Sequence, residues 1–166
     1  PEKRFRILEV DLTVQKTRTI DVTEEGKAFM GGRALGARLL WDHVPPLADP
    51  MGEKNILFVG IGPITGLMGS VTNVSAKSPL TFLRGQANLT AIFGAELPYT
   101  GFNAGILVKG RSPKPVYLLV HNGNVEIRDA AFVWGRSGLE TQYALQRALQ
   151  KETGEPGFRF LAIGPA

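Results

Sequence analysis

The polar residues best suited to ligand binding are concentrated between residues 75 and 96. This window supplies a cation in Lys77, an amide in Asn88, and hydroxyl groups that include Ser75 and Thr90. Together with backbone N–H groups near glycine, such donors can hold a phosphorylated or otherwise polar ligand. The alternative is a surface loop whose polar groups satisfy one another, and composition alone favours that alternative.

Candidates for acid–base or metal chemistry are isolated in the sequence. Glu96 could serve as a general base or as an ion-pair partner, and a lone carboxylate favours the second role. His43, near a predicted helix end, is interpreted as structural, and His121, beside a predicted turn, is expected to face solvent. The chain contains no cysteine, which excludes thiolate zinc sites and cysteine-ligated iron–sulfur clusters within it.

The Gly60-x-Gly62 pair after an apolar run does not predict a dinucleotide site. The third glycine of the G-x-G-x-x-G pattern would fall at Thr65, and Pro63 lacks the N–H that a phosphate would need. No phosphate-binding Walker A sequence occurs either. We therefore interpret the pair as a tight turn from a strand into a loop.

Composition indicates a single globular domain over residues 1–166. Hydrophobic residues make up 43%, charged residues 20%, and the net charge is only +4 with scattered basic residues. No apolar run approaches the roughly 18–20 residues of a membrane span, and no signal-peptide pattern is present. We expect a cytoplasmic protein with neither nucleic-acid nor membrane partners. Because a predicted strand runs into the last residues, we also expect a fragment truncated at its C-terminus.

Hydrophobic patterning predicts an α+β fold, with strands in hairpins and few helices. The expected strands cover residues 5–12, 18–22, 55–59, 71–76, 105–108, 116–120, 125–128 and 158–163. Helices are expected from an N-cap at Thr23, broken by Gly31-Gly32 and resuming over 33–42, near 91–97, and from Ser137 to about Thr153. Asn122-Gly123 predicts a type I′ hairpin turn, and Ser137 with Glu140 predicts a capping box.

One short internal similarity points to a duplicated unit. Residues 57–63 and 160–165 both run from an apolar stretch into Gly-Pro.

Several short motifs, collinear over nearly the whole chain, resemble the N-terminal domain of the aldehyde:ferredoxin oxidoreductases. The motifs are Gly31-Gly32-Arg33-Ala34-Leu35-Gly36, Gly62-Pro63-Ile64-Thr65-Gly66, Asn73, Ala76-Lys77-Ser78-Pro79-Leu80-Thr81, Ala87-Asn88, Phe93-Gly94-Ala95-Glu96-Leu97, Gly101-Phe102-Asn103-Ala104, Lys114-Pro115-Val116-Tyr117, Val125-Glu126-Ile127-Arg128-Asp129-Ala130, Trp134-Gly135 and Ile163-Gly164-Pro165-Ala166.

The resemblance implies a cofactor-supporting base domain of two related β-rich repeats. On it would sit tungsten or molybdenum held by two pyranopterins, whose phosphates share a magnesium ion at Asn88. Thr90, Asn73 and Lys77 would help to hold the cofactor, and a 4Fe-4S cluster would lie in later domains. Val71 stands where many family members have an arginine that links the pterin to the cluster, and Thr90 stands where glycine is frequent.

The resemblance also implies an activity for the parent protein. It would oxidise an aldehyde with water to a carboxylic acid and pass electrons to ferredoxin or another redox partner. Alternatives are a subunit of a related aromatic-thioester reductase and a non-catalytic assembly module. The sequence does not choose between the metals, the substrates or the oligomeric states, a homo-oligomer included, and names no catalytic residue.

Overall fold

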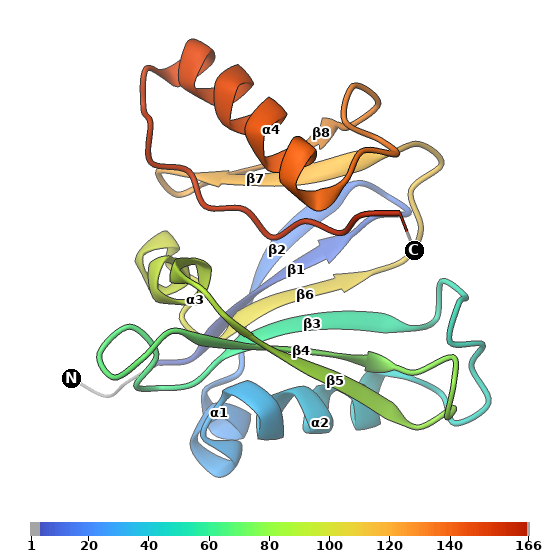
Figure 1. The fold of residues 1–166 in the computed structure, drawn as a ribbon. Helices are drawn as coiled ribbons and strands as arrows, with labels where there is room; N and C mark the ends of the chain where they lie inside the picture. The colour runs from blue at the N-terminus through green and yellow to red at the C-terminus, as the bar shows by residue number, and fades with distance from the viewer. Residues whose placement is uncertain (1–3, 166) are drawn as a thin grey trace.

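A six-stranded mixed sheet forms the centre of the computed structural model, which describes residues 4–165 (Figure 1). The strands are β1 (Arg6–Asp11), β2 (Lys16–Asp21), β3 (Ile56–Ile61), β4 (Val71–Lys77), β5 (Arg84–Thr90), β6 (Gly105–Lys109), β7 (Val116–His121) and β8 (Asn124–Asp129). The helices are α1 (Thr23–Phe29), α2 (Gly32–His43), α3 (Ile92–Glu96), the short 3₁₀ helix η1 (Leu97–Thr100) and α4 (Gly138–Thr153).

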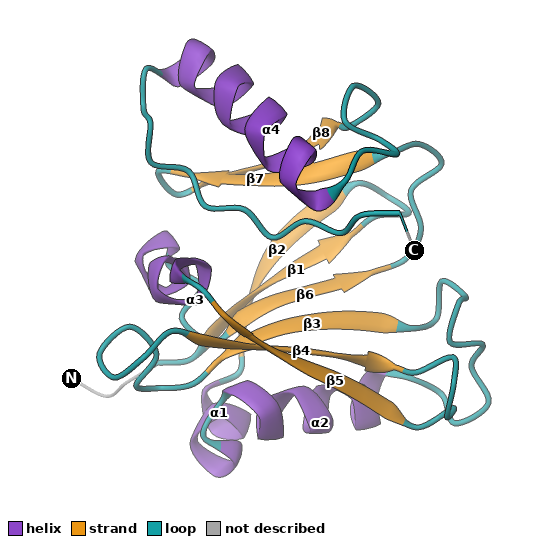
Figure 2. Ribbon diagram, viewed as in Figure 1, coloured by secondary structure: helices purple, strands orange, loops and turns teal. Residues whose placement is uncertain are grey.

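The central sheet has the order β2-β1-β6-β3-β4-β5, and β7 and β8 form a separate two-stranded sheet. β1 and β6 are parallel, and the other neighbours are antiparallel. Figure 2 shows α1 and α2 on one face of the central sheet, with the β7–β8 hairpin and then α4 stacked on the other. The predicted α+β class is therefore confirmed.

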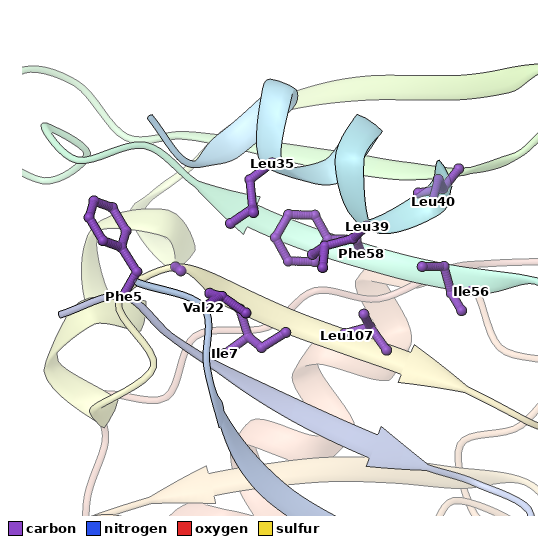
Figure 3. Close-up of a cluster of buried hydrophobic side chains, with 10 residues drawn as sticks. Phe5, Ile7, Val22, Leu35, Leu39, Leu40, Ile56, Phe58 and Leu107 are labelled. Atoms are coloured by element: carbon purple, nitrogen blue, oxygen red, sulfur yellow. The ribbon is translucent and has the colours of Figure 1, made fainter. Parts of the chain in front are cut away.

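The core between α2 and the sheet is centred on Phe58, whose side chain is fully buried. Figure 3 shows its ring between leucines of α2 and apolar side chains of the neighbouring strands. The cluster comprises Phe5, Ile7, Val22, Leu35, Leu39, Leu40, Ile56, Phe58, Ala104 and Leu107. Because side chains alternate along a strand, the other residues of β1, β3 and β6 face the opposite side, where they pack against the β7–β8 hairpin.

The sequence predictions are confirmed where adjacent residues determine the conformation of a turn or a helix cap. Asn122 and Gly123 both have positive φ, at 49° and 81°, as the predicted type I′ turn requires. Ser137 and Glu140 form the predicted capping box, with the Glu140 N–H donating to Ser137 Oγ over 3.3 Å. The helix that this box opens ends at Gly154 in a left-handed conformation.

The predicted N-cap at Thr23 is wrong by one residue. Val22 occupies the cap position of α1, and Thr23 is the first helical residue. The Thr23 hydroxyl is instead used to accept a hydrogen bond from the Phe5 N–H at 3.0 Å, which ties the helix to the chain before β1.

The predicted last strand, residues 158–163, is also wrong. This segment is irregular and pairs with no strand in the described chain. It is held by packing instead, since Phe160 lies against the cluster of Ala130, Val133 and Leu145. The two Gly-Pro segments thus differ locally, because Gly62 follows a strand and Gly164 follows an irregular segment. Among residues 4–165 no helix has the length and apolarity to cross a bilayer.

Candidate functional site

The ladder between β4 and β5 brings the candidate residues onto one face of the sheet. Val71 lies opposite Thr90, and Asn73 lies opposite Asn88. Side chains two residues apart share a face, so Lys77 belongs to the same side of β4. Four of the five residues named from the sequence therefore form two cross-strand pairs at the start of β4 and the end of β5.

Helix α2 lies over this face because a glycine allows close approach. A Cβ at Gly36 would lie 2.9 Å from a ring carbon of Phe58 and 3.1 Å from Ser75 Oγ. At the start of the helix, Gly31 has φ of 74° and packs on the Ile61 carbonyl and on Gly62, so the motifs that begin at Gly31 and Gly62 meet there. These contacts place the first turns of α2 beside the β4–β5 pairs.

A chain of hydrogen bonds crosses the face from β5 to β4 and back to β5. Arg84 Nη2 donates to Ser75 Oγ at 2.9 Å, and Ser75 Oγ donates to Asn73 Oδ1 at 2.7 Å. Asn73 Nδ2 then donates to Asn88 Oδ1 at 2.9 Å. The orientation of the Asn88 amide is thereby fixed, and its N–H groups have no hydrogen-bond partner within residues 4–165.

The exposed end of this chain suits an anionic oxygen ligand. Asn88 and Thr90 are exposed on the edge strand, and Val71 is 46% exposed beside them. An amide N–H and a hydroxyl are neutral donors of the kind that bind phosphate oxygens. No group of three His, Cys, Asp or Glu side chains that could hold a metal occurs in the described residues. An ion at Asn88 would therefore have to draw most of its ligands from a bound phosphate or from water.

Lys77 is not brought into this cluster. Its ammonium donates to the carbonyls of Pro46 and Ala48 at 2.6 and 2.8 Å, and the residue is 8% exposed. Its backbone N–H donates to Asn55 Oδ1 at 3.1 Å. The side chain therefore anchors the loop before β3.

The motif at residues 93–97 packs against β4 through α3. Gly94, in α3, lies against Thr72 and the Ser70 carbonyl, where a side chain would collide with the Thr72 hydroxyl. That hydroxyl is buried and has no partner within the described chain. Glu96 is exposed and forms no ion pair with any residue from 4 to 165.

The histidine interpretations need correction. His43 is exposed at the end of α2 and belongs to none of the hydrophobic clusters of residues 4–165, so it is not structural in the sense predicted. His121 does not simply face solvent, because its side chain is only 27% exposed and its Nε2 lies 3.0 Å from Glu155 Oε2. Its ring also packs on Phe158, with centroids 5.3 Å apart.

Sequence reasoning missed Arg84, because it did not identify β5 as a strand. The strand is rich in polar residues and contains a glycine, so its hydrophobic pattern is weak. Arg84 Nη2 also donates to the Arg33 carbonyl at 2.9 Å, which links β5 to the first turn of α2. Burial lowers the pKa of Arg84, and the nearby charge of Arg33 lowers it further. Strand alternation backward from Asn88 would have placed Arg84 on the same face.

Comparison with known proteins identifies the family. Residues 7–166 match the family described as aldehyde ferredoxin oxidoreductase, N-terminal domain. The tungsten-containing aldehyde ferredoxin oxidoreductase of Thermococcus kodakarensis is 39% identical over 165 residues, covering 97% of this chain and 26% of that protein. The aliphatic sulfonate oxidoreductase, WOR-like subunit, of Pyrococcus furiosus is 38% identical and covers 89% of this chain and 24% of that protein.

A solved structure shows the same fold. The active-site complex BamBC of benzoyl coenzyme A reductase, in complex with 1,5-dienoyl-CoA, superposes with a TM-score of 0.84 at 31% identity, covering 91% of this chain and 24% of that one. The chain thus spans about a quarter of the length of the relatives it matches. It belongs to the aldehyde ferredoxin oxidoreductase family, in which it corresponds to the N-terminal domain.

Proposed function

We propose that this chain is the N-terminal, cofactor-supporting domain of a cytoplasmic tungsten-pterin oxidoreductase. The parent protein would oxidise an aldehyde with water to a carboxylic acid and deliver two electrons, through a 4Fe-4S cluster in another domain, to ferredoxin. When bound, the metal and its pterins supply the redox chemistry. The contribution of this chain is binding and orientation.

The observation that carries the proposal is the fixed Asn73–Asn88 pair on the exposed β4–β5 face. Asn73 is 4% exposed and uses its amide nitrogen to hold Asn88 Oδ1 at 2.9 Å. The N–H groups of Asn88 and the hydroxyl of Thr90 would donate to a phosphate bound at this face. A magnesium ion between two pterin phosphates would take phosphate oxygens as its main ligands, and the second lone pair of Asn88 Oδ1 would be the side-chain contact that this pair offers it. Val71 offers only an apolar contact at this position.

Elemental analysis of the full-length protein, purified without oxygen, tests the proposal. We expect tungsten or molybdenum together with about four irons per chain, the content of one cubane cluster. Iron without either heavier metal would contradict pterin catalysis. The absence of both would indicate a non-catalytic assembly module, for which the changes at Val71 and Thr90 would be the explanation.

A matched pair of variants ties the result to this domain. Asn88→Ala removes the exposed donor, whereas Asn124→Ala removes an exposed amide on β8, on the opposite side of the sheet. We expect the first variant to lower the metal and pterin content of the full-length protein and the second to leave both unchanged. Equal contents in the two variants would refute the role of Asn88.

The structural similarity to BamBC supports a second candidate, a subunit of an aromatic-thioester reductase. The two candidates differ in substrate. We expect the full-length protein to reduce a viologen dye with an aldehyde as electron donor. Failure with a panel of aldehydes, together with oxidation of reduced dye by benzoyl coenzyme A, would favour the second candidate.

A further inference from the structure

The β4–β5 face carries positive charge that the fold does not neutralise. The guanidinium of Arg84 is held by neutral oxygens, those of the Arg33 carbonyl, Ser75 and Asn73, at 2.9, 2.9 and 3.5 Å. Within the described part of the chain, no carboxylate pairs with Arg84 or with Arg33. Buried or half-buried cations are ordinarily paired, because desolvation without a counter-charge is costly.

All three hydrogen bonds of Arg84 use one nitrogen, Nη2. Nε is buried and without a partner among residues 4–165. Nη1 also lacks a hydrogen bond to those residues, yet it is not among the buried unpaired atoms, so it reaches the surface. The geometry thus fixes the guanidinium in place and leaves one N–H₂ group available to a ligand.

Two observations relate Arg84 to its neighbours on this face, Asn88 and Arg33. Arg84 contacts Asn73, which in turn holds Asn88, so the side chains of Arg84 and Asn88 share Asn73 as a hydrogen-bond partner. The charge of Arg33 is close enough to lower the pKa of Arg84. Two like charges held near each other raise the free energy of the empty site, and an anion between them would relieve that repulsion.

We propose that Arg84 and Arg33 form a phosphate-binding subsite next to Asn88. The inference rests on the proposed function, because the phosphate would be that of the pterin cofactor. A guanidinium is suited to this role, since it stays ionised even when its pKa falls and its flat N–H groups match phosphate oxygens. A bound anion would also balance the charge of the guanidinium, which no carboxylate within residues 4–165 does.

The test measures binding of inorganic pyrophosphate by calorimetry. The full-length protein is produced in a host that cannot make the pterin, so the site is free. The variants are Arg84→Met, Arg84→Lys and Arg33→Met, with Arg147→Met, an exposed arginine on α4, as the matched control. Arg33→Met keeps the backbone carbonyl that Arg84 uses, and the Arg33 side chain makes no hydrogen bond within residues 4–165, so this variant should fold normally.

We expect Arg84→Met and Arg33→Met each to weaken pyrophosphate binding about tenfold, the scale of one charge-assisted contact. Arg84→Lys should weaken it less, and Arg147→Met should leave it unchanged. The proposal is overturned if the unmodified protein does not bind pyrophosphate or if Arg84→Met and Arg33→Met bind it as tightly as the unmodified protein.

Pterin content of the same proteins, made in a pterin-producing host, separates this inference from the proposed function. Arginine-dependent pyrophosphate binding in a protein that never contains pterin would retain the subsite and contradict the proposed function. Unchanged pyrophosphate affinity and unchanged pterin content in Arg84→Met would contradict the subsite and retain the proposed function.

Discussion

Buried charge is paired with opposite charge near one edge of the central sheet and is left unpaired at the other edge. On β1, next to the β2 edge, Glu9 has a side chain only 5% exposed, and it is paired with Arg18 at 2.7 Å and with Lys109 at 3.1 Å. At the β5 edge, Arg84 is half-buried and has no carboxylate partner in the described chain. Near the first edge, the charge of Glu9 is balanced by cations of the same chain. The second edge retains a cation that only a ligand or another domain can balance.

The pKa directions follow the same contrast. Burial works to raise the pKa of Glu9, but hydrogen bonds and charges from Arg18 and Lys109 outweigh it and hold the pKa below its usual value. Burial lowers the pKa of Arg84, and the charge of Arg33 adds to that effect. Charge at the β1–β2 edge therefore stabilises the fold, whereas charge at the β4–β5 edge costs stability in the absence of a ligand.

The largest expected effect comes from removing both cations at the first edge. Arg18→Met with Lys109→Met leaves the Glu9 carboxylate buried and unpaired. At pH 7 we expect the opening free energy of β1, β2 and β6 to fall by about 3 kcal/mol, measured by hydrogen exchange on the full-length protein. The control is Arg38→Met, which breaks a half-exposed pair with Asp42 and should cost under about 0.5 kcal/mol.

The pH dependence of that double variant sharpens the test. In the unmodified protein the folded-state pKa of Glu9 is lowered, so its stabilisation is present above the ordinary pKa and is lost as the pH falls through the folded value. Without Arg18 and Lys109 only burial remains, which raises the pKa and reverses the sign. The destabilisation should therefore shrink between pH 7 and pH 4, and a constant difference would contradict the assignment.

Asn73→Ala should have the next largest effect. It removes the acceptor of Ser75 and Arg84 and the donor to Asn88, at a residue that is 4% exposed. We expect exchange protection of β4 and β5 to fall by about 2 kcal/mol. Asn88→Ala deletes the exposed end of the same hydrogen bond and should cost clearly less. Equal losses of protection in Asn73→Ala and Asn88→Ala would contradict this prediction, because the buried Asn73 would then contribute no more than the exposed Asn88.

Lys77→Met tests whether the charge of that residue serves the loop or a ligand. The carbonyls of Pro46 and Ala48 would lose their donor, so amides of residues 44–55 should lose about 1.5 kcal/mol of protection. Because the ammonium is buried and donates to these two carbonyls, pyrophosphate affinity should remain unchanged. A loss of affinity without loss of loop protection would return Lys77 to the candidate binding residues.

Sequence patterns predicted the parts of the fold in which neighbouring residues determine the geometry. Asn122-Gly123 and the Ser137–Glu140 box are such cases, because the turn and cap conformations depend on residues within the motif. The apolar run at β3 was also recognisable, since strands covered on both faces are continuously hydrophobic. The collinear motifs then supplied the family and the candidate residues.

The remaining errors concern partners distant in sequence. The segment at 158–163 has strand-like composition, but packing of Phe160 on α4, rather than a neighbouring strand, determines its conformation. β5 has no hydrophobic pattern, and its strand state depends on pairing with β4. Strand alternation from Asn88 could have placed Arg84 on the correct face only once β5 was recognised, and its contact with the Arg33 carbonyl spans 51 positions.

Among the variants of the two charge clusters and of the Asn73 network, Arg84→Met should change stability least, and this small effect would distinguish the second edge from the first. The variant loses hydrogen bonds to the Arg33 carbonyl and to Ser75, but it also removes a desolvated charge and the unpaired Nε. These effects oppose each other, so we expect protection of β4 and β5 in the pterin-free protein to change by less than about 1 kcal/mol. Ser75→Ala is the comparison variant, since it removes a hydrogen bond and keeps the charge. A loss of 3 kcal/mol in Arg84→Met would mean that Arg84 stabilises the fold as the Glu9 cluster does, and the contrast between the two edges would no longer hold.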